Sequence, residues 1–412
     1  MRGHIRKRGK NSYSLVISLG KDAATGKYKY HWESVQGTKK DAEKHLAEVL
    51  YQLDTGTYIK PGKTTLGEYL EKWLSDYVWP SLAPKTAEGY EHIIRRHLIP
   101  SLGNMPLAQL KPENLQRYYS EKLSNGRCDG KGALSPRTVR HHHVTLHDAL
   151  ESAVKWGLLS RNPADGVSPP RYQRPEWNTL SEDDIHTLLE TAISTPYYAL
   201  FHTAIYSGMR RSELLALRWS DIDLLLCQIY ITRTLHHLRD GNIIFKAPKT
   251  TKGRRMIALS PTAVSVLREH KEKQELDRTM LGIPLRDDDL VFSDLEGKPL
   301  LPDTVTHAWI KLVRRTNLRG IRLHDARHSH ASLMLKAGIH PKIVQERLGH
   351  SSIALTLDTY SHVAPGLQEA AAESFDKILN IRRENPTVEN HYLQIISKKE
   401  NASEIKGEPE AF

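Results

Sequence analysis

The stretch SGMRRSELLALRWSDID (207–223) contains a change from one helix to the next, and the organisation of the chain can be worked out from it. Gly208 is suited to end an apolar helix predicted over 197–207, because glycine adopts the left-handed backbone conformation without strain. The next helix then begins near Arg210, at a position where backbone N–H groups favour an anion. Taken alone, Arg210 is best interpreted as an exposed arginine paired with Glu213.

Three further polar clusters lie in the same segment, and each has an ordinary structural explanation when taken alone. They are PKTTKGR (248–254), LHDARH (323–328) and LGH (348–350), the last followed by a tyrosine at 360. His324 and His328 have the i, i+4 spacing of a zinc-binding helix, but Asp325 stands where such a motif has glutamate, and no third ligand is marked. We therefore expect no metal at this position.

The elements predicted around these clusters, in 178–375, are both helices and strands. Helices are expected over 182–192 and 197–207 and again from 261 onward, and strands over 228–235, 243–247 and 254–259. The first two strands are expected to pair through the turn Asp240-Gly241, and the last two through a turn rich in Lys, Thr and Gly. This order predicts a mixed, mainly helical domain with a small antiparallel sheet.

The preceding segment, 65–165, is predicted to be all-helical. Its apolar residues recur at helical spacing, and Thr65 is placed to begin the first helix. Further helices are expected over 84–98, 112–123 and 136–156. The second of these should end before Pro100, and a proline-rich linker is expected at about 163–177.

The N-terminal 63 residues carry most of the excess positive charge, with 13 Lys and Arg against 6 Asp and Glu. Alternation over 12–19 and 27–35 predicts a hairpin, and a helix capped by Thr38 is predicted over 39–53. A linker follows at 56–64. A basic surface on a folded module indicates a polyanionic partner, because each phosphate that Lys or Arg neutralises releases counterions.

The composition narrows the class of protein. The chain has 412 residues, a net charge of +11 and a pI near 9.4, and is too long for one ordinary domain. Hydrophobic residues at 39% and charged residues at 26% indicate folded cores. Two cysteines, Cys128 and Cys227, rule out a disulfide scaffold. With no secretory signal and no apolar run of membrane-spanning length, we expect a soluble protein of a reducing compartment that has no membrane partner.

In combination, the clusters strongly resemble the tyrosine recombinases, also called phage integrases. Arg-x-x-Glu, Pro-Lys-Thr, His-x-x-Arg and Leu-Gly-His with a trailing tyrosine occur in this order. The resemblance covers 178–375, and the matching stretches are SGMRRSELLALRWSDID (207–223), PKTTKGRRMIAL (248–259), LHDARHSHASLMLKAG (323–338) and LGHSSIALTLDTYSHV (348–363). By pattern and order, 65–165 resembles the family's helical core-site DNA-binding domain. Residues 1–60 resemble the three-stranded arm-site-binding domain of integrases from temperate phages and conjugative transposons.

The resemblance implies a fold and a complete set of site residues. The fold is multidomain α+β: a three-stranded sheet with one helix, an all-α domain, and a mainly α catalytic domain with a small antiparallel sheet. The implied boundaries are 1–60, 65–165 and 178–380, with a polar tail at 381–412. The catalytic positions are Arg210, Lys249, His324, Arg327, His350 and the nucleophile Tyr360, with Glu213 supporting the first arginine.

The chemistry of a phosphodiester agrees with these assignments. Its non-bridging oxygens gain negative charge as a nucleophile adds, and two guanidiniums bind such oxygens with planar paired donors. A phenol has a pKa of about 10, so Tyr360 needs help in losing its proton. His324 is the candidate for that help, while His350 donates to a phosphate oxygen and Lys249 protonates the leaving 5′ oxygen. No metal or other cofactor is implied, because the arginines supply the positive charge.

The resemblance also implies a reaction and its partners. Tyr360 attacks double-stranded DNA to form a 3′-phosphotyrosine, and a 5′-hydroxyl from a partner duplex then rejoins the strands. Four protomers exchange strands through a Holliday junction on core-type and arm-type attachment sites, with excision and DNA-bending proteins as accessory partners in the bacterial cytoplasm. The N-terminal module favours integration of a prophage or other mobile element.

Several alternatives stay open in the sequence. A type IB topoisomerase uses the same phosphotyrosine chemistry, and a resolvase of the same family acts on two sites within one molecule. A non-catalytic DNA-binding regulator built on a decayed recombinase is the alternative from a different class. A short helix expected over 370–379 could dock on a neighbouring protomer or pack on its own domain. The run HHH (141–143) is expected on a helix surface, with contact to a DNA groove as the alternative.

Overall fold

The computed structural model describes residues 3–21, 26–54, 63–172, 178–318 and 320–360, with a few positions between 372 and 379. The chain divides into two compact units, Met1–Arg174 and Pro175–Phe412. Most of the predicted linker at 56–64, the end of the linker at 163–177, most of the helix expected over 370–379 and the tail 381–412 lie outside the described residues.

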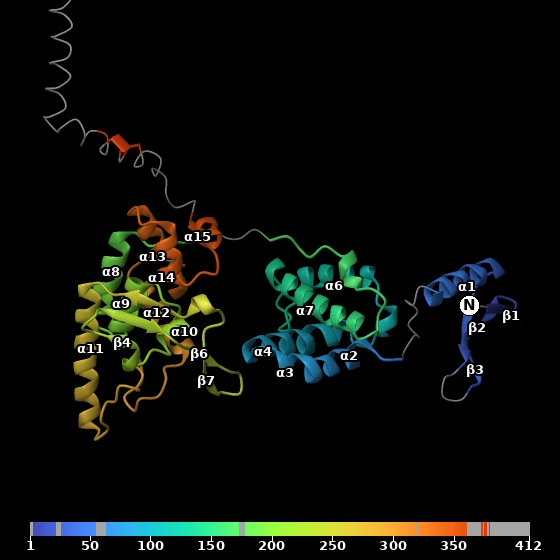
Figure 1. Ribbon diagram of the computed structural model, residues 1–412, viewed down its shortest axis with the longest axis horizontal. Coiled ribbons are helices and arrows are strands. Elements are labelled where there is room, and N and C mark those ends of the chain that lie inside the picture. The colour runs from blue at the N-terminus through green and yellow to red at the C-terminus, as the bar shows by residue number, and fades with distance from the viewer. Residues whose placement is uncertain are drawn as a thin grey trace, which may run out of the picture. The chain divides into compact units, whose positions relative to one another are not determined.

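The N-terminal module consists of a three-stranded sheet and one helix (Figure 1). Its elements are β1 (Gly3–Gly9), β2 (Ser12–Lys21), β3 (Tyr28–Gln36) and α1 (Lys39–Asp54). The strands form an antiparallel sheet in the order β1-β2-β3, and buried Leu15 and Ile17 of β2 pack against Ala42 and Val49 of α1. The backbone N–H of Asp41 donates to the Thr38 hydroxyl, at 3.3 Å, so the predicted cap, helix and hairpin are confirmed.

The second part of the first unit is helical, as predicted. Its helices are α2 (Leu66–Trp73), α3 (Trp79–Ser81), α4 (Pro84–Ile93), α5 (Ile99–Leu102), α6 (Pro112–Asn125) and α7 (Pro136–Lys155). The hydroxyl of Thr65 accepts from the N–H of Glu68 and the Glu68 carboxylate accepts from Thr65, a reciprocal cap that starts α2. Buried Trp73, Tyr118 and Tyr119 lie in the core between the helices.

The predicted helix end before Pro100 was wrong. A π-helical turn over Ile94–Leu98 joins α4 to α5, and the N–H of Ile99 donates to the carbonyl of Ile94. Proline lacks an N–H and clashes with the carbonyl four residues earlier in a regular α-helix. The wider π turn relieves that clash, so the helix continues through Pro100 to Leu102.

His142 is buried, so the prediction of a surface histidine run was wrong for this residue. It lies on the face of α7 that also buries Val139 and Leu146, whereas His141 is exposed. The Nδ1 atom of His142 is 2.9 Å from the hydroxyl of Tyr118. Burial, followed by the charge of nearby basic groups, lowers the pKa of His142 to about 3.

This buried histidine makes the stability of the helical domain depend on pH. In the unfolded chain the pKa of histidine is about 6.5. Below that pH the unfolded state therefore binds a proton that His142 in the folded state does not bind. We expect the free energy of unfolding to decrease from pH 7 to pH 5, measured by amide hydrogen exchange in peptides from α7. The dependence should be weaker in His142→Gln and unchanged in His141→Gln. An equal dependence in His142→Gln and wild type would contradict the assignment.

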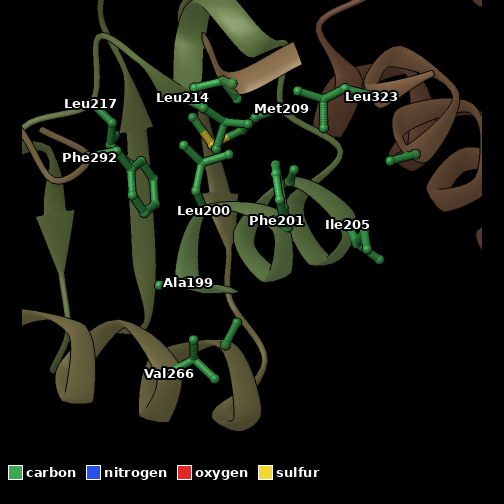
Figure 2. Close-up of a cluster of buried hydrophobic side chains, with 14 of the residues drawn as sticks. Ala199, Leu200, Phe201, Ile205, Met209, Leu214, Leu217, Val266, Phe292 and Leu323 are labelled. Atoms are coloured by element: carbon green, nitrogen blue, oxygen red, sulfur yellow. The ribbon is translucent and has the colours of Figure 1, made fainter. Parts of the chain in front are cut away.

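The second unit contains the four polar clusters at 207–223, 248–254, 323–328 and 348–350. Its helices are α8 (Glu182–Ala192), α9 (Tyr198–Ser207), α10 (Arg211–Leu214), α11 (Pro261–Met280), α12 (Pro302–Arg315), α13 (Leu323–Lys336), α14 (Pro341–Leu348) and α15 (Ile353–Tyr360). The central helix is α9, which packs against α8, α11 and α13. Figure 2 shows Leu200 and Phe201 of α9 among the buried apolar side chains, with Met209 and Leu214 from the chain that follows.

The strands of this unit form two sheets rather than the predicted one. They are β4 (Ile222–Asp223), β5 (Gln228–Ile231), β6 (Thr234–His237), β7 (Ile243–Lys246) and β8 (Arg255–Ala258). β6 and β7 form the hairpin expected at Asp240-Gly241, but the predicted pairing of the last two strands was wrong, because β8 pairs with β5. The expected strand 228–235 is split, and its halves enter different sheets.

No helix in the described part of the chain is long and apolar enough to cross a membrane.

Candidate active site

The junction between α9 and α10 is formed as the sequence predicts. Gly208 adopts a left-handed conformation, with φ of 65°, and a Cβ there would lie 2.7 Å from the ring of His330. Arg210 follows as the N-cap of α10. Its backbone N–H donates to Glu213 Oε2 at 2.9 Å, and its Nη1 donates to Oε1 at 2.8 Å. The predicted pairing of Arg210 with Glu213 is therefore present.

Arg327 joins two helix ends that are far apart in the sequence. It lies on α13 and is 3% exposed. Its Nη1 donates to the carbonyl of Gly208 at 2.7 Å and its Nη2 to the carbonyl of Leu348 at 2.6 Å. Arg210 Nη2 lies 3.4 Å from the carbonyl of Gly349, the next residue. Three of the four sequence clusters therefore meet at the end of α14.

Glu213 is buried, and sequence reasoning missed its second partner, Arg255 on β8. Arg255 Nη1 and Nη2 donate to the two carboxylate oxygens of Glu213 at 3.1 and 2.8 Å. Burial alone would raise the pKa of Glu213, but the hydrogen bonds and charge of Arg255, with the charges of Arg210 and Arg327, lower it to about 2. One carboxylate thus stays ionised among three guanidiniums. The only sequence signal for Arg255 was its position inside PKTTKGRRMIAL (248–259).

The two predicted histidines differ in their surroundings. His350 is buried, and its Nδ1 lies 2.9 Å from the hydroxyl of Thr356 on α15. Burial, then the charges of Arg327 and Arg210, lower its pKa to about 3, so it is neutral at pH 7. His324 is exposed on the first turn of α13, but desolvation of its ring and the charge of Arg327 also lower its pKa. Neutral imidazole can accept a proton or donate a hydrogen bond without adding charge.

Lys249 and Tyr360 lie on segments that border this group. Lys249 is exposed in the turn after β7 and forms no hydrogen bond or ion pair with any residue that the structure describes. Nearby, Lys252 Nζ donates to the carbonyl of Ser351 at 2.7 Å, which holds the turn against the residues after α14. Tyr360 is the last residue of α15, a helix that packs against α13 and α14.

The arrangement suits an anion with several oxygens. Arg210, Arg327 and Arg255 contribute three positive charges against the single carboxylate of Glu213, and the side chain of Arg210 is 37% exposed. Planar guanidiniums bind phosphate oxygens through paired donors, and a preorganised cluster stabilises charge that develops on those oxygens.

Family models match three successive parts of the chain. The phage integrase family matches residues 178–366, the N-terminal SAM-like domain of phage integrases matches 65–123, and an arm DNA-binding domain matches 4–53. A XerC-like tyrosine recombinase of Caldanaerobacter subterraneus is 27% identical, with 90% of this chain and 97% of the relative covered. The ICEBs1 integrase of Bacillus subtilis is 25% identical over 91% of this chain and all of the relative.

A solved structure has the same fold. The integrase of transposon Tn1549, in complex with a circular intermediate DNA, aligns with a TM-score of 0.63 and 20% identity, over 76% of this chain and 99% of that one. The chain belongs to the phage integrase family of tyrosine recombinases, site-specific enzymes that cleave and rejoin DNA strands. The predicted family, the α+β fold class and DNA as the partner are confirmed.

Proposed function

We propose that the protein integrates a prophage or other mobile element, with Tyr360 as the nucleophile that forms a 3′-phosphotyrosine. The observation that carries this proposal is the turn after α14. The carbonyl of Leu348 accepts from Arg327, that of Gly349 lies within reach of Arg210, and His350 contacts α15, the helix that ends at Tyr360. A phosphate beside this turn would lie next to Arg210 and Arg327 and next to α15, the helix that ends at Tyr360.

Each group of the site then has one task. Arg210 and Arg327 bind the non-bridging oxygens, and Glu213 orients Arg210 through its two contacts. His350 donates to a phosphate oxygen, and His324 accepts the proton of Tyr360. Because the pKa of His324 is lowered, its imidazole is neutral at pH 7 and is able to accept that proton. Lys249 protonates the leaving 5′ oxygen. The energy of the broken bond is retained in the phosphotyrosine, so the reaction needs no nucleotide cofactor.

The assembly follows from counting strands. Recombination between two duplexes cuts four strands, and each protomer carries one Tyr360, so four protomers act together and pass through a Holliday junction. The same proposal includes excision with accessory DNA-bending proteins and a location in the bacterial cytoplasm, where the DNA lies. Resolution of two sites in one molecule is the alternative outcome of the same chemistry.

The exposed face of the N-terminal sheet supports an arm-type DNA-binding role for residues 1–60. Tyr28, Tyr30 and Trp32 alternate along β3, and all three are about half exposed on the face opposite α1. Arg6 of β1 lies over the Trp32 ring at 5.4 Å, and Lys21 of β2 over the Tyr28 ring at 5.6 Å. A face of aromatic and basic side chains can contact both bases and phosphates. Residues 65–165 then bind the core site, and 178–380 carry the chemistry.

Deletion of residues 1–60 should separate these roles. We expect the truncated protein to form covalent adducts on core-site DNA at close to the wild-type rate, because its proposed catalytic groups lie in the second unit. Integration between plasmids that carry complete attachment sites should fall at least about tenfold, since arm-site contacts contribute much of the salt-dependent affinity. Equal integration by the two proteins would show that residues 1–60 are not an arm-binding module.

The function itself is tested by trapping the covalent adduct. The wild-type protein is incubated with nicked duplexes tiled from the DNA that flanks its gene, where mobile elements often carry their site. A denaturant-resistant adduct on one duplex supports the integrase and locates the crossover site. Relaxation of supercoiled plasmid without sequence preference would instead favour a topoisomerase. Tight binding without an adduct, on nicked and junction substrates alike, would favour the non-catalytic regulator.

A further inference from the structure

Arg255 connects the turn that contains Lys249 to the rest of the site. Its side chain is 6% exposed. Besides the two contacts with Glu213, its Nη1 donates to the carbonyl of Gly253 at 3.1 Å and its Nε to the carbonyl of Arg347 at 2.6 Å. Gly253 belongs to the turn after Lys249, and Arg347 to the last turn of α14. One buried guanidinium therefore bonds three segments.

The same turn is packed closely against the residues that follow α14. A Cβ added at Gly349 would lie 2.8 Å from the carbonyl oxygen of Lys252 and 3.0 Å from Nη1 of Arg255. Lys252 Nζ adds its bond to the carbonyl of Ser351. Because Lys249 itself is exposed and has no bonding partner among the described residues, the reach of its Nζ depends on where this turn is held.

We propose that Arg255 is a positioning residue for the recombination reaction, which holds the turn so that Lys249 reaches the leaving 5′ oxygen. This inference rests on the proposed role of Lys249. In the cleavage step, a bond forms between the Tyr360 oxygen and phosphorus while the bond from phosphorus to the 5′ oxygen breaks. The phenol proton passes to His324, and Lys249 Nζ gives a proton to the 5′ oxygen. Arg255 acts by bonding the backbone of this turn at Gly253 and the backbone of α14 at Arg347.

A substrate whose leaving group needs no proton tests this role. Nicked core-site duplexes are prepared with either oxygen or sulfur at the bridging 5′ position of the scissile phosphate. A thiol has a pKa of about 8.5, far below the value of about 16 for water, so sulfur leaves as a thiolate without a general acid. We expect Arg255→Met to slow adduct formation about 100-fold on the oxygen substrate, the size of a typical general-acid effect, and less than about tenfold on the sulfur substrate.

Three further variants complete the experiment. Lys249→Ala should show the same rescue by sulfur, and Arg255→Lys, which keeps the charge, should fall between Arg255→Met and wild type. Arg254→Met is the matched control, because Arg254 is the exposed neighbour with the same charge, and its ratio of oxygen to sulfur rates should equal that of wild type. This ratio does not depend on the fraction of folded protein, so a destabilised variant remains informative.

The outcomes separate this inference from the proposed function. Equal slowing of both substrates by Arg255→Met, or no slowing of either, overturns the positioning role while wild-type adduct formation still supports the recombinase. Absence of any adduct with wild type on both substrates would contradict the proposed chemistry itself. Slowing of Lys249→Ala without rescue by sulfur would overturn the general-acid role on which the inference rests.

Discussion

Substitution of Tyr360 by phenylalanine is expected to abolish the covalent adduct with core-site DNA. The change removes only the hydroxyl that would attack phosphorus, and loss of a nucleophile typically lowers the rate by at least about 10⁴-fold. DNA binding should be retained, because Arg210, Arg327 and the other basic groups are unchanged. The measurement is denaturing gel electrophoresis of the adduct on a nicked duplex, with affinity measured in parallel by gel shift.

A control is offered by Tyr206, a tyrosine of the same unit whose backbone carbonyl accepts from Arg347. Its ring stacks on His202 at 4.1 Å, which gives its side chain a packing role. Tyr206→Phe should therefore form adducts at a rate close to wild type. An adduct that persists in Tyr360→Phe and disappears in Tyr206→Phe would show that the nucleophile has been assigned to the wrong tyrosine.

Substitution of Glu213 by alanine is expected to have the largest effect on stability. The side chains of Glu213 and Arg255 are 1% and 6% exposed, so the variant leaves a buried guanidinium without its carboxylate. Breaking a buried ion pair by removing one partner costs about 3–5 kcal/mol. We expect a loss of this size in the free energy of unfolding of the second unit, measured by amide hydrogen exchange in peptides from α9 and α13.

Two comparisons make this prediction specific. Glu182→Ala removes an exposed carboxylate whose partner Lys336 is also exposed, so it should cost less than about 1 kcal/mol. Adding Arg255→Met to Glu213→Ala should restore part of the lost stability, because the unpaired buried charge is then gone. A double variant less stable than Glu213→Ala would contradict this account.

The pKa of Glu213 is lowered to about 2, so the contribution of this pair persists at pH 5 and is lost only as the pH falls below about 4.5 toward 2.

Local features of the fold were predictable because neighbouring residues decide them. Gly208 ends α9 with φ of 65°, as the sequence predicted. Thr38 caps α1, and Thr65 caps α2, through side-chain bonds to residues three positions later. Each of these depends on a backbone conformation or a hydrogen bond within one helical turn. The order of the motifs along the chain likewise indicated the family.

Strand pairing and burial were not predictable in the same way. Nothing in the sequence of 243–259 shows that β8 pairs with β5 rather than with β7, because pairing depends on a partner and a register far along the chain. His142 looked like one of three equivalent histidines, but only the packing of α7 against α6 places it beside Tyr118 and lowers its pKa.

The sequence by itself determined the family, the order of the motifs, most helix starts, and the identity of the residues proposed to carry the chemistry. Only the tertiary structure decided how those residues are held. Glu213 and Arg255 are 42 positions apart, and Arg327 is 119 positions from the carbonyl of Gly208 that it binds. A buried charge must be paired or hydrogen-bonded, and the partners available to it depend on how the helices pack. Neighbouring residues in the sequence do not determine which partner that is.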